Sequence, residues 1–166
     1  MRILGVDPGT QRLGYGILEY ESDSPQCLDW GCLDVSKTKP LHDRLNSLHK
    51  GLRDIVNYWQ PDHLAVEEPF VSIAKGAKSA IAIGQAQAVA LILASDTGME
   101  VYRYHPTQVK RAVGDYGGST KTHLQRMVQI VLGMEPEPMD EDASDALAIA
   151  ICHVREWSSA MRVSQR

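Results

Sequence analysis

The stretch RILGVDPGTQRLGYGILEY, residues 2–20, contains an apolar run, a turn and a second run with alternating residues. Residues 2–7 form the apolar run, which is typical of a buried strand. The segment DPGTQR follows, and its Pro-Gly pair favours a turn. Residues 13–20 alternate and include two glycines, which predicts a second strand paired with the first in a hairpin. We therefore expect Asp7 at the end of a buried strand.

Three other acidic residues occur in contexts that would aim them at one place. Glu67 ends a second apolar run, residues 64–66, and a proline follows shortly after it. Asp142 and Asp145 are three residues apart where an alanine-rich segment begins, so on a helix they share one face. Two strand ends and a helix start can converge in an α/β fold. Carboxylates forced together repel one another unless cations lie between them, and hard oxygen ligands suit Mg²⁺ or Mn²⁺. With Asp7, these residues predict a divalent-metal site.

The rest of the chain alternates between strand and helix patterns. Three strands in an antiparallel meander are followed by alternating helices and strands, which predicts an α/β fold with a five-stranded mixed sheet and helices on both faces. We expect one domain over residues 1–157 and a polar, flexible tail over 158–166. The further elements are expected at strand 27–35, helix 41–58, strand 64–67, helix 77–95, strand 99–104, a short helix after Pro106, and helices 119–132 and 140–157.

Composition and cysteine usage indicate a cytoplasmic globular protein. The 166 residues are 43% hydrophobic and 23% charged, close to globular averages. The three cysteines lack CxxC spacing, which favours a reducing compartment, and the N-terminus shows no signal-peptide pattern. Residues 77–95 are apolar but include Lys78, Gln85 and Gln87 and fall short of the roughly 20 apolar residues of a membrane span. We expect that helix in the core or at a dimer contact, and no membrane association.

The net charge of −4 hides a segregation of charge along the sequence. Residues 103–126 hold five Lys or Arg and one acid, whereas residues 135–145 hold six acids and no base. Two divalent cations on the acidic cluster would offset the net charge, and the basic segment could then follow phosphates of a nucleic acid. The alternative is that both segments are ordinary solvated faces.

Six short motifs, taken together and in order, resemble the RuvC family of Holliday junction resolvases. They are VDPGT, AVEEPF, GQAQA, QVK, STK and DASDALAIA, and they span nearly the whole chain. The resemblance implies a ribonuclease H-like fold and a homodimer that binds four-way DNA junctions and nicks them in pairs with Mg²⁺ during homologous recombination and DNA repair. It also implies a branch-migration motor complex as partner. The family's catalytic carboxylates fall on Asp7, Glu67, Asp142 and Asp145.

Phosphodiester hydrolysis gives these four carboxylates a role as metal ligands. Two cations can stabilise the attacking and the leaving oxygen while lowering the pKa of the nucleophilic water. We expect two Mg²⁺ ions, with Mn²⁺ as a substitute, and products with 5′-phosphate and 3′-hydroxyl ends. Asp7 would bridge the ions, because its strand is the middle one of the sheet. Taken alone, Asp7 could be a turn former, and Asp142 and Asp145 could simply favour a helix N-terminus.

Glu67 competes with its neighbour Glu68 for the role of ligand. Adjacent strand residues point to opposite faces of the sheet, so only one of the two can face the other carboxylates. The family pattern selects Glu67.

Five residues are candidate DNA contacts. By the resemblance, Phe70 would stack on an unpaired base, and Lys110 and Lys121 would lie near the scissile phosphate. Lys75 and Lys78 follow Phe70 closely and extend this basic region. The alternatives are a core aromatic for Phe70 and solvated surface positions for the lysines.

Other classes of function fit parts of the sequence. Actin-like and sugar-kinase ATPases also open with an Asp-x-Gly-Thr loop after the first strand, but they need two duplicated domains. Another ribonuclease H-like nuclease could act on RNA or an RNA–DNA hybrid, and a junction-binding module could lack activity. We expect His105, His123 and His153 to be structural rather than catalytic.

Overall fold

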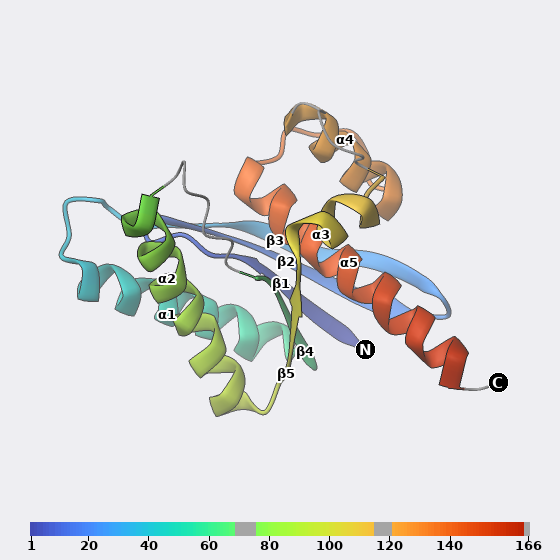
Figure 1. Ribbon diagram of the computed structural model, residues 1–166, viewed down its shortest axis with the longest axis horizontal. Helices are drawn as coiled ribbons and strands as arrows, with labels where there is room; N and C mark the ends of the chain where they lie inside the picture. Colours follow the sequence, from blue (N-terminus) through green and yellow to red (C-terminus); the bar gives the residue numbers. More distant parts are fainter. Residues whose placement is uncertain (69–75, 115–120, 165–166) are drawn as a thin grey trace.

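The computed structural model describes residues 1–68, 76–114 and 121–164, which form one five-stranded sheet between two layers of helices (Figure 1). The strand order is β3-β2-β1-β4-β5, antiparallel from β3 to β1 and parallel from β1 to β5. This confirms the predicted mixed sheet with the first strand in its middle. The elements are β1 Arg2–Asp7, β2 Arg12–Glu21, β3 Ser24–Asp34, α1 Leu41–Trp59, β4 His63–Glu67, α2 Gly76–Thr97, β5 Glu100–Tyr104, α3 Pro106–Ala112, α4 Lys121–Leu132 and α5 Glu141–Ser164.

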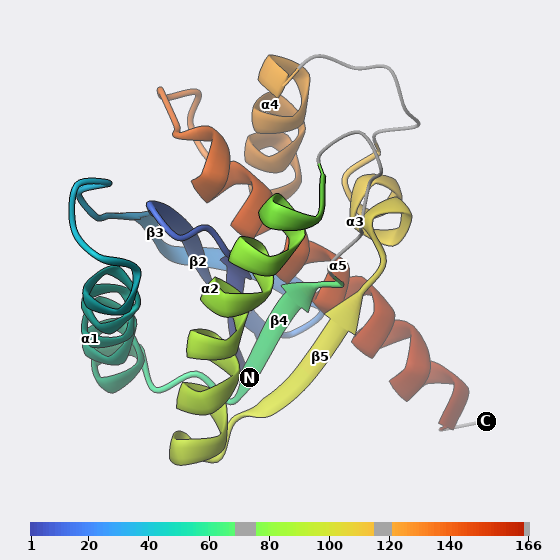
Figure 2. The same cartoon turned by 60° about the vertical axis from the view of Figure 1, so that its left-hand side comes forward.

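The two faces of the sheet carry different helices. Helices α1 and α2 cover one face, and α5 crosses the other, with α3 and α4 beside it (Figure 2). Because successive strand residues point to opposite faces, Leu4 and Val6 of β1 pack with α1 and α2, whereas Ile3 packs with α5. The same alternation holds in β4, where Ala65 belongs to the α5 side.

Glycines in β1 and β2 allow the backbone of α5 to lie directly on the sheet. A Cβ atom at Gly5 would overlap the carbonyl oxygen of Ala146, and one at Gly14 would overlap that of Asp142. At Gly16 it would meet the side chain of Leu147 at 2.5 Å. The helix is therefore held closest to the sheet where its first turns cross β1 and β2.

The C-terminal helix is longer than predicted. We expected it to end near Trp157, but α5 continues to Ser164, and most of the expected polar tail is helical. Residues 158–164 contain no glycine or proline that would end a helix. An ion pair of 3.5 Å between Arg162 and Asp23 also ties this last turn to the connection between β2 and β3.

Helix α2 has one buried side and one exposed side. Its segment Ala80–Thr97 is long and apolar enough to cross a membrane by length and composition, and 33% of that segment is buried within the fold. The predicted core contact is confirmed, because Ala90, Leu93 and Ala94 pack against β1, β4 and α1. Ile81 and Ile92 remain 62% and 58% exposed.

Candidate active site

Asp7 and Glu67 end neighbouring strands at the same edge of the sheet. Asp7 is the last residue of β1 and Glu67 the last of β4. The two strands are parallel, and Val6 lies opposite Val66, so the acids that follow end side by side. Each acid is half-buried.

The alternation of side chains distinguishes Glu67 from Glu68. On β4, Ala65 packs on the α5 side of the sheet, so Glu67, two residues later, has the same orientation. On β1, Gly5 contacts α5 in the same way, which gives Asp7 that orientation too. Glu68 follows the end of the strand and is exposed. The orientation therefore agrees with the choice of Glu67.

The first turn of α5 lies beside these two strand ends. Gly14 is the partner of Asp7 across the β1–β2 pair, and the backbone of Asp142 lies directly on Gly14. Asp145 is one turn further along, next to Ala146, whose carbonyl lies on β1. Two strand ends and a helix start thus meet at one edge of the sheet, as the sequence predicts.

The four acids belong to elements that lie side by side, but their side chains do not form a tight cluster. Within residues 1–68, 76–114 and 121–164, no three His, Cys, Asp or Glu side chains are close enough to hold one metal ion. Carboxylate oxygens are the donors that Mg²⁺ prefers, so the donor set fits such an ion by its chemistry. Side-chain rotation would be needed to bring three of them onto it.

Arg12 is a charged residue of this edge that sequence analysis missed. It begins β2, and its Nε lies 2.9 Å from Asp34 Oδ1 while its Nη1 lies 3.1 Å from Asp140 Oδ1. Its Nε is also 3.8 Å from Asp142 Oδ2. One signal could have identified it, because the six acids of residues 135–145 have no base among them and need one from another element.

The candidate DNA contacts are only partly placed. Lys110 is exposed on α3, which follows the end of β5 opposite Glu67 and so lies at the same edge as the carboxylates. Phe70 and Lys75 lie outside the described residues. Lys78 belongs to α2 and Lys121 begins α4, but the positions of their side chains are not described.

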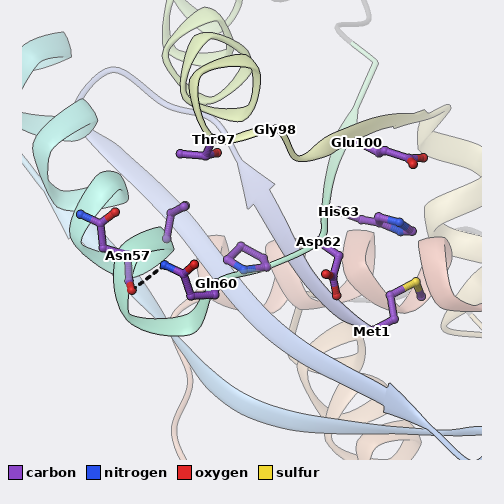
Figure 3. A pocket seen from close by; sticks show the side chains of 10 residues that line it. Met1, Asn57, Gln60, Asp62, His63, Thr97, Gly98 and Glu100 are labelled. Carbon is purple, nitrogen blue, oxygen red and sulfur yellow. Dashed lines mark hydrogen bonds between the residues drawn. The ribbon is translucent and has the colours of Figure 1, made fainter.

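A hollow in the described surface lies at the other end of the sheet. Its volume is about 860 Å³, and it lies beside the starts of β1, β4 and β5, where Met1, His63 and Glu100 are found (Figure 3). Gln60, which donates a 2.9 Å hydrogen bond to the carbonyl of Asn57, forms part of its wall. The carboxylates end these strands rather than begin them, so this hollow is not the candidate active site.

Two of the three histidines singled out from the sequence make hydrogen bonds within the fold. His105 caps α3 and accepts a hydrogen bond from the Thr107 backbone. His153 is fully buried on α5, with hydrogen bonds of 2.8 Å to His63 and 2.7 Å to Tyr104. Burial, and after it the nearby His63, together lower the pKa of His153 to about 4, so the ring is neutral at pH 7.

Comparison with known proteins agrees with this geometry. Residues 3–153 match the family described as Crossover junction endodeoxyribonuclease RuvC. The chain is 45% identical over 153 residues to the Chloroflexus aggregans protein of that name, covering 92% of each chain. It is 42% identical over 165 residues to the Dehalococcoides mccartyi protein, covering 99% of each.

A solved structure extends the agreement to the fold. The structure of Thermus thermophilus RuvC in complex with a Holliday junction substrate matches with a TM-score of 0.84 and 29% identity, over 96% of each chain. The family match, the curated relatives and this structure all span the strand ends and the helix start that carry the four acids. The chain belongs to the RuvC family of crossover junction endodeoxyribonucleases.

Proposed function

We propose that this protein is a homodimeric endonuclease that resolves four-way DNA junctions by paired, symmetric, metal-dependent nicks. The observation that carries the proposal is the meeting of Asp7, Glu67 and the first turn of α5 at one sheet edge, in a chain of this family. The biological setting would be homologous recombination and DNA repair in the cytoplasm, with a branch-migration motor complex as partner.

The four carboxylates would act as metal ligands. Asp7, on the central strand, and Glu67, on the neighbouring strand, would hold the metal from the edge of the sheet. Asp142 and Asp145, on one face of α5, would close the shell from above the sheet. When bound, two Mg²⁺ ions, or Mn²⁺ in their place, would stabilise the attacking and leaving oxygens and lower the pKa of the nucleophilic water. The products would carry 5′-phosphate and 3′-hydroxyl ends.

Basic and aromatic residues would position the DNA. Lys110, exposed on α3 beyond the end of β5, would contact a phosphate near the cut, and Lys121 at the start of α4 would do the same. Phe70 would stack on an unpaired base at the junction. Lys75 and Lys78 would contact the backbone nearby.

The exposed side of α2 is our candidate for the homodimer contact. Ile81 and Ile92 are eleven residues apart, which is close to three helical turns, so they lie on one side of the helix with Gln85 and Ala88 between them. We expect the double substitution Ile81→Asp with Ile92→Asp to give a monomer in sedimentation equilibrium. The matched control is Val163→Asp at the exposed end of α5, which should leave the dimer intact.

The proposed activity is tested with three substrates. The purified protein is given a mobile synthetic four-way junction, a linear duplex and an RNA–DNA hybrid, each with and without Mg²⁺. We expect symmetric nicks confined to the junction and dependent on the metal. Cleavage of the hybrid alone would instead identify a ribonuclease H-like enzyme acting on RNA. Binding of ATP without any cleavage would favour the actin-like or sugar-kinase class.

A further inference from the structure

Arg12 is surrounded by three acids from two different parts of the fold. Asp34 ends β3, Asp140 directly precedes α5, and Asp142 is in the first turn of α5. The firm contacts of the guanidinium are with Asp34 and Asp140, at 2.9 and 3.1 Å, and the approach to Asp142 is looser, at 3.8 Å. Arg12 is thus anchored by two acids that are not candidate ligands and lies beside one that is.

The Nε–H group of Arg12 lacks a well-aligned acceptor. The nitrogen is buried and, among the described residues, has no partner with hydrogen-bond geometry, although Asp34 Oδ1 lies 2.9 Å away. The Nη2 atom makes a hydrogen bond of 3.3 Å to Asp34 Oδ2 instead. That hydrogen bond raises the pKa of Arg12 further, so its charge is permanent. A fixed cation with a spare donor therefore lies beside the Asp142 carboxylate.

We infer that Arg12 is a positioning residue, an internal counter-cation that holds the Asp142 carboxylate at the start of α5 and competes for it with a divalent metal ion. The inference rests on the proposed role of Asp142 as a metal ligand. It also fits the arrangement at this edge of the sheet, where Asp142 lies next to Arg12 and, among the described residues, belongs to no group of three side chains close enough to hold one metal ion.

Removal of Arg12 has two opposing effects on the affinity for a divalent metal ion. Loss of Arg12 frees the rotamer of Asp142, which weakens metal binding slightly. The backbone of Asp142 stays fixed, because it lies on Gly14 and the next residue, Ala143, is fully buried. Loss of the positive charge beside Asp142 should strengthen binding of a divalent ion by about three- to tenfold at a high effective dielectric constant. The charge term is the larger one, so removal of Arg12 should tighten metal binding.

The test uses Arg12→Gln, Arg12→Lys and a matched control at the opposite end of the sheet. In the control, Arg2→Gln, the lost partner is Glu19 at 3.0 Å, and the two arginines are similarly exposed, 42% and 39%. Binding of Mn²⁺ is measured by calorimetry, and the unfolding temperature is measured with and without Mn²⁺. We expect Arg12→Gln to bind Mn²⁺ about three- to tenfold more tightly and to melt at a lower temperature only without the metal. Arg12→Lys and Arg2→Gln should bind like the wild type.

Each other outcome overturns a defined part of the argument. Weaker Mn²⁺ binding by Arg12→Gln would mean that the guanidinium only orients the ligand, and unchanged binding would mean an ordinary surface ion pair. Either result contradicts the counter-cation inference. If Arg12→Gln does not fold, Arg12→Ser takes its place. Its Mn²⁺ binding and its unfolding temperature are compared with those of the wild type in the same way. Absence of Mn²⁺ binding by the wild type itself would instead contradict the proposed function.

Discussion

Helix α5 carries two groups of polar residues, one exposed and charged near its start and one buried and hydrogen-bonded near its middle. In its first turn, the Asp142 side chain is 36% exposed and lies beside Arg12, where charges meet water. Further along, His153 is completely buried and is hydrogen-bonded at both ring nitrogens, to His63 and Tyr104. Open charges that lack full pairing can accept a ligand, whereas a closed neutral network can only hold elements together.

The buried network of His63, Tyr104 and His153 is called the closed end here, and the sheet edge with Asp7, Glu67 and the first turn of α5 is called the open end. The closed end explains how α5 keeps its position at the open end. His63 begins β4, Tyr104 ends β5 and His153 lies in the middle of α5, so the three residues tie the helix to two strands. A neutral His153 satisfies both contacts in either tautomer, because one ring nitrogen donates and the other accepts, while Tyr104 and His63 can take the complementary roles. Substitutions in the two groups should therefore separate activity from stability.

At the open end, Asp7→Asn should have the largest effect on activity and little effect on folding. Changes to residues that merely support a metal ligand typically cost about 10- to 100-fold, and loss of a bridging ligand should exceed that. Cleavage of a four-way junction and binding to it are measured side by side, together with the unfolding temperature. Binding should persist, because phosphate contacts elsewhere are unchanged. Loss of both binding and cleavage in a folded protein would contradict the assignment.

At the closed end, His153→Ala should destabilise the fold by about 3–5 kcal/mol, because it leaves a cavity and two buried polar groups without a partner. Urea unfolding at pH 7.5 gives the free energy of unfolding. The control is His42→Ala, whose side chain is 83% exposed and which should change the free energy by less than about 0.5 kcal/mol. Equal effects of the two substitutions would remove the distinction between the two groups.

Some features of these two polar groups could be predicted from the sequence, and others could not. Hydrophobic periodicity gave the order and type of the elements, because each strand and helix has a continuous buried side. It did not give the end of α5, since residues 159–163 are exposed yet remain helical. The four acids could be proposed because each stands near the end or the start of an element, and the family pattern then selected Glu67 over Glu68.

Partners that are distant in sequence could not be found in the same way. His63 and His153 are 90 residues apart, and neither occurs in a pattern that indicates a partner. Arg12 belongs to the segment DPGTQR, which the sequence predicts as a turn, although it begins β2. Its contacts with Asp34 and Asp140 form only when β3 and α5 are in place. Such contacts depend on tertiary packing, which periodicity does not report.

A pH titration tests whether the network is neutral. The folded pKa of His153 is about 4 against an ordinary value of 6.5, so the unfolded chain takes up the proton first as the pH falls. The stabilisation should be complete above pH 6.5 and be lost progressively towards pH 4, by at most about 3 kcal/mol. His153→Gln, which cannot titrate, should show a flatter free energy of unfolding over this range. Parallel pH profiles would show that His153 takes up its proton at the same pH in the folded and the unfolded protein.

A methyl group added beneath α5 tests how far the open end depends on the close approach of helix and sheet. At Gly14, the added Cβ overlaps the backbone of Asp142, which cannot move without shifting the candidate ligand. Gly14→Ala should therefore cost about 1–3 kcal/mol and also reduce junction cleavage. At Gly16, the added Cβ meets the Leu147 side chain at 2.5 Å and the Leu147 Cα at 3.2 Å, so a rotamer change of Leu147 relieves most of the overlap. Gly16→Ala should therefore destabilise less than Gly14→Ala and leave cleavage nearly unchanged. Equal loss of cleavage in both variants would mean that the whole helix moves as one body, and that the position of Asp142 is not set locally by Gly14.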